Sequence, residues 1–223
     1  MEIKIHQRIG SVDQCAIWPF VKQSGKDHFQ LTSKELLFEY GISIKNRLIF
    51  LSGDIENGKC ETIIRALIFL SSISKEDITL IVSSLGGDLY DTFAIYDTMR
   101  SIPNQIRTIA MGKCQSAAPL LVAGGAAGKR FSLPNCQFMV HDIWIDGASD
   151  ATVEAATKEL RHTKALRKRY LELMALNTKK TAEEWKKICR RPGDLFFGPQ
   201  EALNYGIIDT IANDIVWSKK DGE

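Results

Sequence analysis

Three side chains in this sequence have the types and settings that acyl-transfer chemistry requires: the hydroxyl of Ser116, the imidazole of His141 and the carboxylate of Asp194. A serine hydroxyl is a poor nucleophile until a base removes its proton, and that base needs an acid to fix its tautomer and stabilise its positive charge. Serine and aspartate are common throughout the chain, so the residue types alone decide little. The local sequences around the three residues carry the prediction.

These local sequences alternate between strand and helix patterns. Apolar runs of strand length at 48–51, 78–82 and 106–111 alternate with helical patterns at 60–70 and 90–99. Ser116 follows the third run and precedes the apolar segment 117–123, in which Pro119 suits the first turn of a helix because its missing N–H would be unpaired there. We therefore expect Ser116 at a helix N-terminus, and His141 at the end of the second of two short strands, 129–133 and 137–141.

Paired glycines, Gly86 and Gly87, stand between the 78–82 strand and the following helix. Such a pair lets the backbone approach a ligand closely and leaves N–H groups that can hold an oxyanion. An isolated Gly-Gly pair is more often a simple tight turn. The oxyanion role therefore depends on what surrounds the pair.

A helical repeat of apolar residues predicts a long helix from about residue 150 to 176. At 1.5 Å per residue this helix would reach roughly 40 Å, more than the core of a small domain needs, which indicates a projection used for assembly. A capping box from Thr181 to Glu184 predicts one more helix that closes at 191–193, just before Asp194. Residues 1–45 show no clear period and are interpreted as an N-terminal arm with a first helix.

Composition excludes several classes of protein. The 223 residues fit one α/β domain, and a net charge of +2 from 29 basic and 27 acidic residues argues against nucleic-acid binding. The longest central apolar run, 117–127, is far shorter than a membrane span, and the N-terminus lacks a signal-peptide pattern, so we expect a cytoplasmic protein with no membrane contact. Five cysteines without a CxxC pair predict reduced thiols, and Cys114, two residues before Ser116, is set aside as a nucleophile.

Several blocks of this sequence, taken together and in order, are typical of one family. The blocks are 84–99, 111–124, 128–135, 139–141, 172–176 and 194–209. They resemble the signature blocks of the proteolytic subunit of the Clp protease, ClpP, over about residues 45 to 215. The resemblance implies an α/β fold of ClpP/crotonase-like repeated ββα units, with a peptidase domain at 46–215, a projecting handle of a long helix and a strand at about 142–177, and a C-terminal tail at 216–223.

The resemblance also implies a role for each site residue. Ser116 would be the nucleophile, His141 the general base and Asp194 the acid that orients the base, with the backbone N–H groups of Gly87 and Ala117 as the oxyanion hole. The 25 residues from Ser116 to His141 match the family spacing. Such a site needs no metal and no cofactor.

The identity of the acid is less constrained than that of the nucleophile and base. The interval from His141 to Asp194 is a few residues longer than in the family, and Asp142, Asp146 and Asp150 lie nearer to His141 in the sequence. Because adjacent residues on a strand point to opposite faces, Asp142 is disfavoured most directly. We predict Asp194.

The function implied by the resemblance is a serine endopeptidase that hydrolyses unfolded proteins or peptides inside a ring-shaped homo-oligomer of one or two stacked heptamers. The chain departs from the family pattern at several positions, which are Thr79, Ile81, Leu85, Ala117, Ala118, Asp142 and Ile143. Thr79 and Ile81 replace aromatic residues that help to dock an AAA+ unfoldase, so a ClpX-like or ClpA-like partner is not assumed. Alternatives are a non-catalytic subunit of a mixed ring, a crotonase-type acyl-CoA hydratase or isomerase, and a phage-borne relative acting in capsid maturation or on host proteins.

Overall fold

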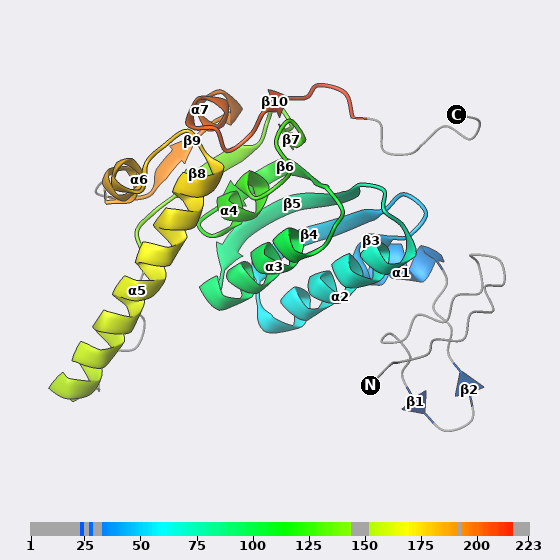
Figure 1. Ribbon diagram of the computed structural model, residues 1–223, viewed down its shortest axis with the longest axis horizontal. Helices are drawn as coiled ribbons and strands as arrows, with labels where there is room; N and C mark the ends of the chain where they lie inside the picture. The colour runs from blue at the N-terminus through cyan, green and yellow to red at the C-terminus, as the bar shows by residue number, and fades with distance from the viewer. Residues whose placement is uncertain (1–22, 25–26, 29–32, 144–151, 191–192, 216–223) are drawn as a thin grey trace.

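The computed structural model describes residues 23–24, 27–28, 33–143, 152–190 and 193–215 (Figure 1). Its centre is an eight-stranded mixed sheet in the order β10-β7-β6-β5-β4-β3, with β8 paired to β6 and β9 paired to β8. The strands are β3 (Ile42–Ser43), β4 (Leu48–Ile55), β5 (Ile78–Gly87), β6 (Ile106–Gln115), β7 (Arg130–Ser132), β8 (Gln137–Val140), β9 (Leu195–Phe197) and β10 (Thr210–Ile211). A separate antiparallel pair joins β1 (Gln23–Ser24) to β2 (Asp27–His28). The predicted α/β class is confirmed.

The three central strands, β4, β5 and β6, pair in parallel and contain the predicted apolar runs. Strands covered on both faces are apolar along their length rather than alternating, and residues 78–82 are all buried. All three strands are longer than predicted, because β4 continues to Ile55, β5 to Gly87 and β6 to Gln115. The extension of β5 contains the glycine pair, and the extension of β6 ends at the residue before Ser116.

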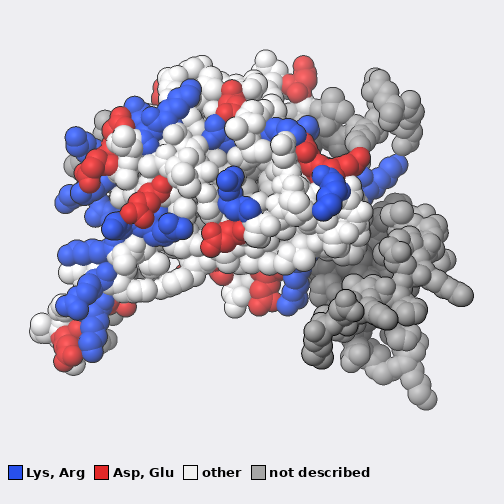
Figure 2. Space-filling view, viewed as in Figure 1, with Lys and Arg blue, Asp and Glu red and all other residues white. Residues whose placement is uncertain are grey.

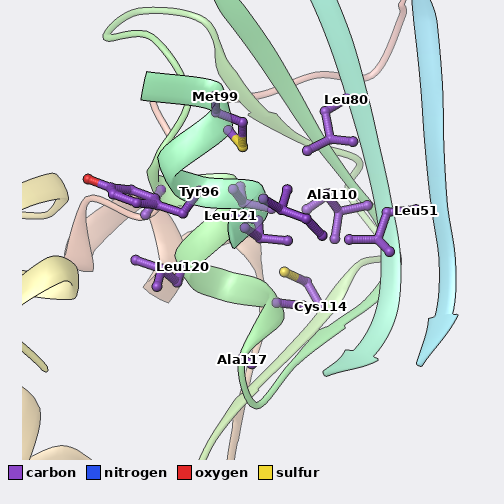
Figure 3. Close-up of a cluster of buried hydrophobic side chains, with 14 of the residues drawn as sticks. Leu51, Leu80, Tyr96, Met99, Ala110, Cys114, Ala117, Leu120 and Leu121 are labelled. Carbon is purple, nitrogen blue, oxygen red and sulfur yellow. The ribbon is translucent and has the colours of Figure 1, made fainter. Parts of the chain in front are cut away.

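Three helices, α2 (Asn57–Ile73), α3 (Leu89–Ser101) and α4 (Ala118–Ala123), cover one face of the sheet (Figure 1). Figure 3 shows how the main core forms there: Tyr96 of α3 and Leu121 of α4 lie in the cluster that Leu80 and Leu51 of the sheet complete. Burying one leucine side chain contributes about 1.5–3 kcal/mol. All six residues of α4 are buried, so the turn before α4 leads directly into the packed core.

The longest helix, α5 (Val153–Asn177), projects past the edge of the sheet (Figure 1). Its 25 residues span about 37 Å, close to the predicted length. The buried residues of α5 are all in its second half, from Tyr170 to Met174, so its first half extends away from the core. The strand predicted for the handle falls largely in 144–151, outside the described residues.

The last part of the described chain packs beside the second half of α5. It contains α6 (Ala182–Cys189), β9 and α7 (Pro199–Tyr205), while α1 (Ser33–Tyr40) precedes β3 at the other edge of the sheet. The capping box predicted for α6 is confirmed: Thr181 Oγ1 accepts from Glu184 N–H at 3.2 Å, and Glu184 accepts from Thr181 N–H at 2.8 Å. Among the described helices, none combines the length and apolar character needed to cross a membrane.

Candidate active site

Ser116 lies in a sharp turn between β6 and α4. Its φ of +57° is rare for a residue with a side chain, and such strained positions occur at functional sites. Two hydrogen bonds hold the turn: Ser116 N–H donates to the Met139 carbonyl at 2.9 Å, and the Tyr170 hydroxyl donates to the Ser116 carbonyl at 2.9 Å. The cap of α4 is Ala117 rather than Ser116, so the serine sits one residue further from the helix than predicted.

His141 follows β8, which pairs in parallel with the end of β6. The register sets Met139 opposite Gln115, so the residues that follow the two strands emerge at the same edge of the sheet. His141 Nε2 lies 2.7 Å from Ser116 Oγ, within hydrogen-bond distance, and both residues are half-buried. The nucleophile and base predicted from the sequence are therefore in contact, and Nδ1 is the ring nitrogen that a carboxylate would orient.

The Gly86–Gly87 pair packs directly against this turn. A Cβ atom on Gly86 would lie 2.5 Å from Ser116 Cβ and 2.9 Å from the Ala117 nitrogen, while one on Gly87 would lie 2.2 Å from the Ile55 carbonyl oxygen. Both glycines also have positive φ, +97° and +147°. Only glycine fits either position, so the pair is more than a simple tight turn. Because the two residues lack side chains, the β5 backbone can lie against the turn that contains Ser116.

Asp194 precedes β9, which pairs antiparallel with β8. The ladder sets Phe196 opposite Met139 and ends with Leu195 opposite Val140, and continuing its register by one step would set Asp194 opposite His141. Residues directly opposite each other on antiparallel strands share a face of the sheet. The structure records no hydrogen bond between these two described residues, and Asp194 is exposed in the single chain. Asp194 and His141 therefore lie at the same end of the β8–β9 ladder, and the acid role of Asp194 stays a prediction.

Comparison with known proteins matches residues 33–214 to the family model for Clp protease. This range contains the serine turn, the histidine, the glycine pair and Asp194, and covers most of the chain. The chain belongs to the Clp protease family. Membership of the Clp protease family supports a ClpP-like peptidase in general and implies ring-forming oligomers.

A cavity of about 410 Å³ opens beside the Ser116–His141 pair of this Clp protease family member. Its walls come from the end of β5 and the start of α3, from the serine turn, from the segment after β8 and from α5. The residues that line it are Gly87, Asp88, Leu89, Tyr90, Ser116, Ala117, His141, Asp142, Ile143, Glu159, Thr163, Leu166 and Tyr170. Both predicted oxyanion donors, Gly87 and Ala117, are among them, together with Ser116 and His141.

Burial makes Cys114 a poor candidate for a nucleophile. Its side chain is fully buried, and burial raises its pKa well above the ordinary value, so the reactive thiolate is suppressed. Burial likewise raises the pKa of Cys60 and Cys189 to about 12. Among the described residues, no group of three or more His, Cys, Asp or Glu side chains is placed to bind a metal ion.

Several residues at the site were not predicted from the sequence. Tyr170 supports the serine turn, and burial raises its pKa well above the ordinary value, so its hydroxyl remains a donor. His162 is exposed and stacks on Tyr90 with ring centroids 5.9 Å apart, and its Nε2 hydrogen bonds to the Tyr90 hydroxyl. Tyr170 and Tyr90 form hydrogen bonds with residues more than fifty positions away in the sequence, so no local sequence pattern predicts these contacts.

Asp142, disfavoured as the acid, has a different partner. Its Oδ2 lies 2.9 Å from Arg167 Nη2 of α5. This ion pair fixes the projecting helix to the residue that follows His141. The pair therefore links α5 to the segment that follows His141.

Proposed function

We propose that this chain is a serine endopeptidase in which Ser116 is the nucleophile, His141 the general base and Asp194 the acid that orients His141. The observation that carries the proposal is the 2.7 Å contact between His141 Nε2 and Ser116 Oγ, at a strained turn held against Gly86. Family membership supports a peptidase of the ClpP type in general. The substrate would be a peptide or an unfolded protein segment.

The reaction would follow from the positions of the described groups. His141 Nε2 takes the proton of Ser116 Oγ as this oxygen attacks the peptide carbonyl, and the N–H groups of Gly87 and Ala117 hold the resulting oxyanion. The protonated imidazole then donates its proton to the leaving amine, which leaves an acyl group on Ser116. A water molecule, deprotonated by the same imidazole, hydrolyses this acyl-enzyme.

We further propose that the active form is a ring of identical chains, with heptamers single or stacked as the family resemblance suggests. Large apolar side chains are exposed on the single chain, including Ile68 and Ile73 on α2, Leu176 at the end of α5, and Phe196 two residues after Asp194. Exposed apolar groups of this size favour contact with another copy. A neighbour placed over the edge around Phe196 would also exclude water from Asp194 and draw it onto His141.

We include an AAA+ unfoldase in the proposal as a class of partner and assign it no docking site. Ile81, at a position where the family uses an aromatic docking residue, is buried at 1% exposure against Leu48 and Ile109. Thr79 is buried as well. A partner would therefore bind this chain through contacts other than those that the family's aromatic pair provides.

The test is hydrolysis of a fluorogenic peptide and of an unfolded protein by the purified chain, with particle mass followed by light scattering. We expect hydrolysis by an oligomer, and loss of at least a thousandfold in kcat for Ser116→Ala and for His141→Ala at unchanged particle mass. A ring without hydrolysis would instead indicate the non-catalytic subunit. Turnover of an enoyl-CoA that survives Ser116→Ala would indicate the crotonase-type enzyme.

A further inference from the structure

One face of α5 lines the cavity along much of its length. Tyr170, Leu166, Thr163 and Glu159 are separated by four, three and four residues, the spacing that places side chains on one side of a helix. Tyr170 touches the nucleophile residue through its 2.9 Å bond to the Ser116 carbonyl. Glu159 lies eleven residues earlier, about 16 Å further along the helix axis at 1.5 Å per residue.

The chemical character of the cavity changes along this face. Ala117 adjoins Ser116 and Tyr170 bonds to the Ser116 carbonyl, so these side chains, with Leu166 one helical turn from Tyr170, contribute apolar surface near Ser116. At the other end stands the carboxylate of Glu159. Among the described residues, no lysine or arginine lines the cavity.

The other two carboxylates in the cavity wall already have partners. Asp88 caps α3 and accepts from Tyr90 N–H at 2.8 Å and from Asp91 N–H at 3.0 Å. Asp142 forms the ion pair with Arg167. Glu159 has no hydrogen bond or ion pair within the described part of the chain.

Glu159 also differs from the other acidic residues of α5. Glu154 pairs with Lys158 and Glu172 with Lys168, each at a spacing of four residues, whereas the residues four before and four after Glu159 are Ala155 and Thr163. Figure 2 shows the projecting part of α5 covered mostly by Lys and Arg, with fewer acidic side chains. Among the described residues, Glu159 thus lines the cavity without a cation partner, unlike the other two acidic residues of α5.

We propose that Glu159 is a specificity-determining residue that selects substrates with a lysine or arginine three to five residues from the scissile bond. An extended peptide advances about 3.3 Å per residue, so 16 Å corresponds to about five residues, and the length of a Lys or Arg side chain shortens the separation further. Residues next to the scissile bond would be apolar, to match the walls beside Ser116. This inference rests on the proposed peptidase function and names the class of peptide that the site takes.

The size of the effect follows from the exposure of Glu159. A partly solvated ion pair changes kcat/KM by about two- to fivefold. Because the contact is remote from the reacting atoms and is made equally in ground and transition states, the change falls on KM rather than on kcat.

The test uses quenched fluorescent peptides with one apolar cleavage site and a single lysine or glutamine placed three, four or five residues to either side of the bond. We expect the wild-type protein to prefer lysine over glutamine by two- to fivefold at one or two of these positions. Glu159→Gln should remove the preference, and Glu159→Lys should reverse it toward peptides with glutamate there. Glu154→Gln, on the same helix but outside the cavity lining, should keep the wild-type preference.

The outcomes separate this inference from the proposed function. Cleavage of the glutamine peptide that depends on Ser116, without any advantage for lysine, would overturn the role of Glu159 and leave the peptidase intact. A lysine preference that survives Glu159→Gln would do the same. Failure to cleave any peptide, together with failure of Ser116 to react with a phosphonate, would overturn both.

Discussion

The Tyr170 hydroxyl donates a hydrogen bond of 2.9 Å to the carbonyl oxygen of Ser116, which joins the projecting helix α5 to the strained turn of the proposed nucleophile. Tyr170 is only 6% exposed, so water does not readily replace the donor. The position of α5 and the geometry of the serine are therefore coupled. A movement of α5 would therefore displace the Ser116 carbonyl or break this hydrogen bond.

Tyr170→Phe should lower kcat because it removes this donor from a backbone held at a positive φ. A buried hydrogen bond of this kind contributes about 1 kcal/mol, which corresponds to roughly a fivefold change in rate if all of it is lost in the transition state. Steady-state hydrolysis of a fluorogenic peptide measures kcat and KM. Tyr96→Phe is the matched control, since Tyr96 is also a buried tyrosine but its hydroxyl bonds to Asn177. An equal loss of kcat in both variants would contradict the coupling.

Gly86→Ala should abolish hydrolysis and destabilise the fold, because its Cβ would lie 2.5 Å from Ser116 Cβ at a φ of +97°. Relief of this clash requires the β5 backbone or the serine turn to move. We expect at least a hundredfold loss in kcat/KM and a lower midpoint of thermal unfolding.

Gly58→Ala provides the matched control for Gly86. Gly58 lies in α2, and a Cβ there would meet nothing within 4 Å. Alanine should therefore leave activity unchanged and raise stability by up to about 1 kcal/mol, as expected for glycine replaced inside a helix. Normal activity in Gly86→Ala would show that the glycine pair does not support the nucleophile.

Asp194→Asn tests which carboxylate orients His141. Asp194 and His141 adjoin the last pair of the β8–β9 ladder, so, with Asp194 as the proposed acid, the amide should lower kcat by a factor of about a thousand or more through loss of the imidazole orientation. Asp142→Asn weakens only the ion pair with Arg167 and should cost less than tenfold. Peptide hydrolysis by the two assembled variants is the measurement. The reverse order of effects would assign the acid to Asp142.

Asp209 should make stability depend on pH through its contacts with Arg130. Arg130 Nε donates to Asp209 Oδ2 at 2.9 Å, and Arg130 also donates to the Gly206 carbonyl at 3.0 Å. Burial alone would raise the pKa of Asp209, but the hydrogen bonds and charge of Arg130 outweigh it and hold the pKa below the ordinary value. The stabilisation is therefore complete above about pH 4, the pKa in the unfolded chain, and is lost as the pH falls through the folded pKa.

Asp209→Asn should lower the free energy of unfolding by about 1.5–3 kcal/mol at pH 7, as measured with urea at fixed protein concentration. The difference from wild type should shrink as the pH falls below about 4. Glu61→Gln removes an exposed ion pair with Arg65 and should change the free energy by less than about 0.5 kcal/mol at either pH. A pH-independent difference for Asp209→Asn would contradict the assigned charge interaction.

Much of the fold was predictable because its central strands are buried on both faces and are therefore continuous apolar runs. The segment 83–87 was not recognised as strand because Ser-Ser-Leu-Gly-Gly has no apolar period, although its backbone pairs with β4 and β6. Strands of two or three residues, such as β3 and β10, carry too few side chains to show a pattern.

The site was predictable where its residues stand in distinctive local sequence. Ser116, His141 and the glycine pair could be named, but their contact depends on the pairing of β6 with β8, which the 25-residue interval does not encode by itself. Tyr170 and Glu159 look like ordinary members of an amphipathic helix. Their place at the site depends on how α5 packs, which is a tertiary property.

The central claim is that His141 activates Ser116. The most direct measurement treats the assembled protein with a serine-reactive phosphonate and locates the adduct by mass spectrometry. We predict a single adduct on Ser116, with labelling slowed by at least a hundredfold in His141→Ala. An intact oligomer in which Ser116 stays unlabelled, or in which labelling proceeds equally fast without His141, would contradict it.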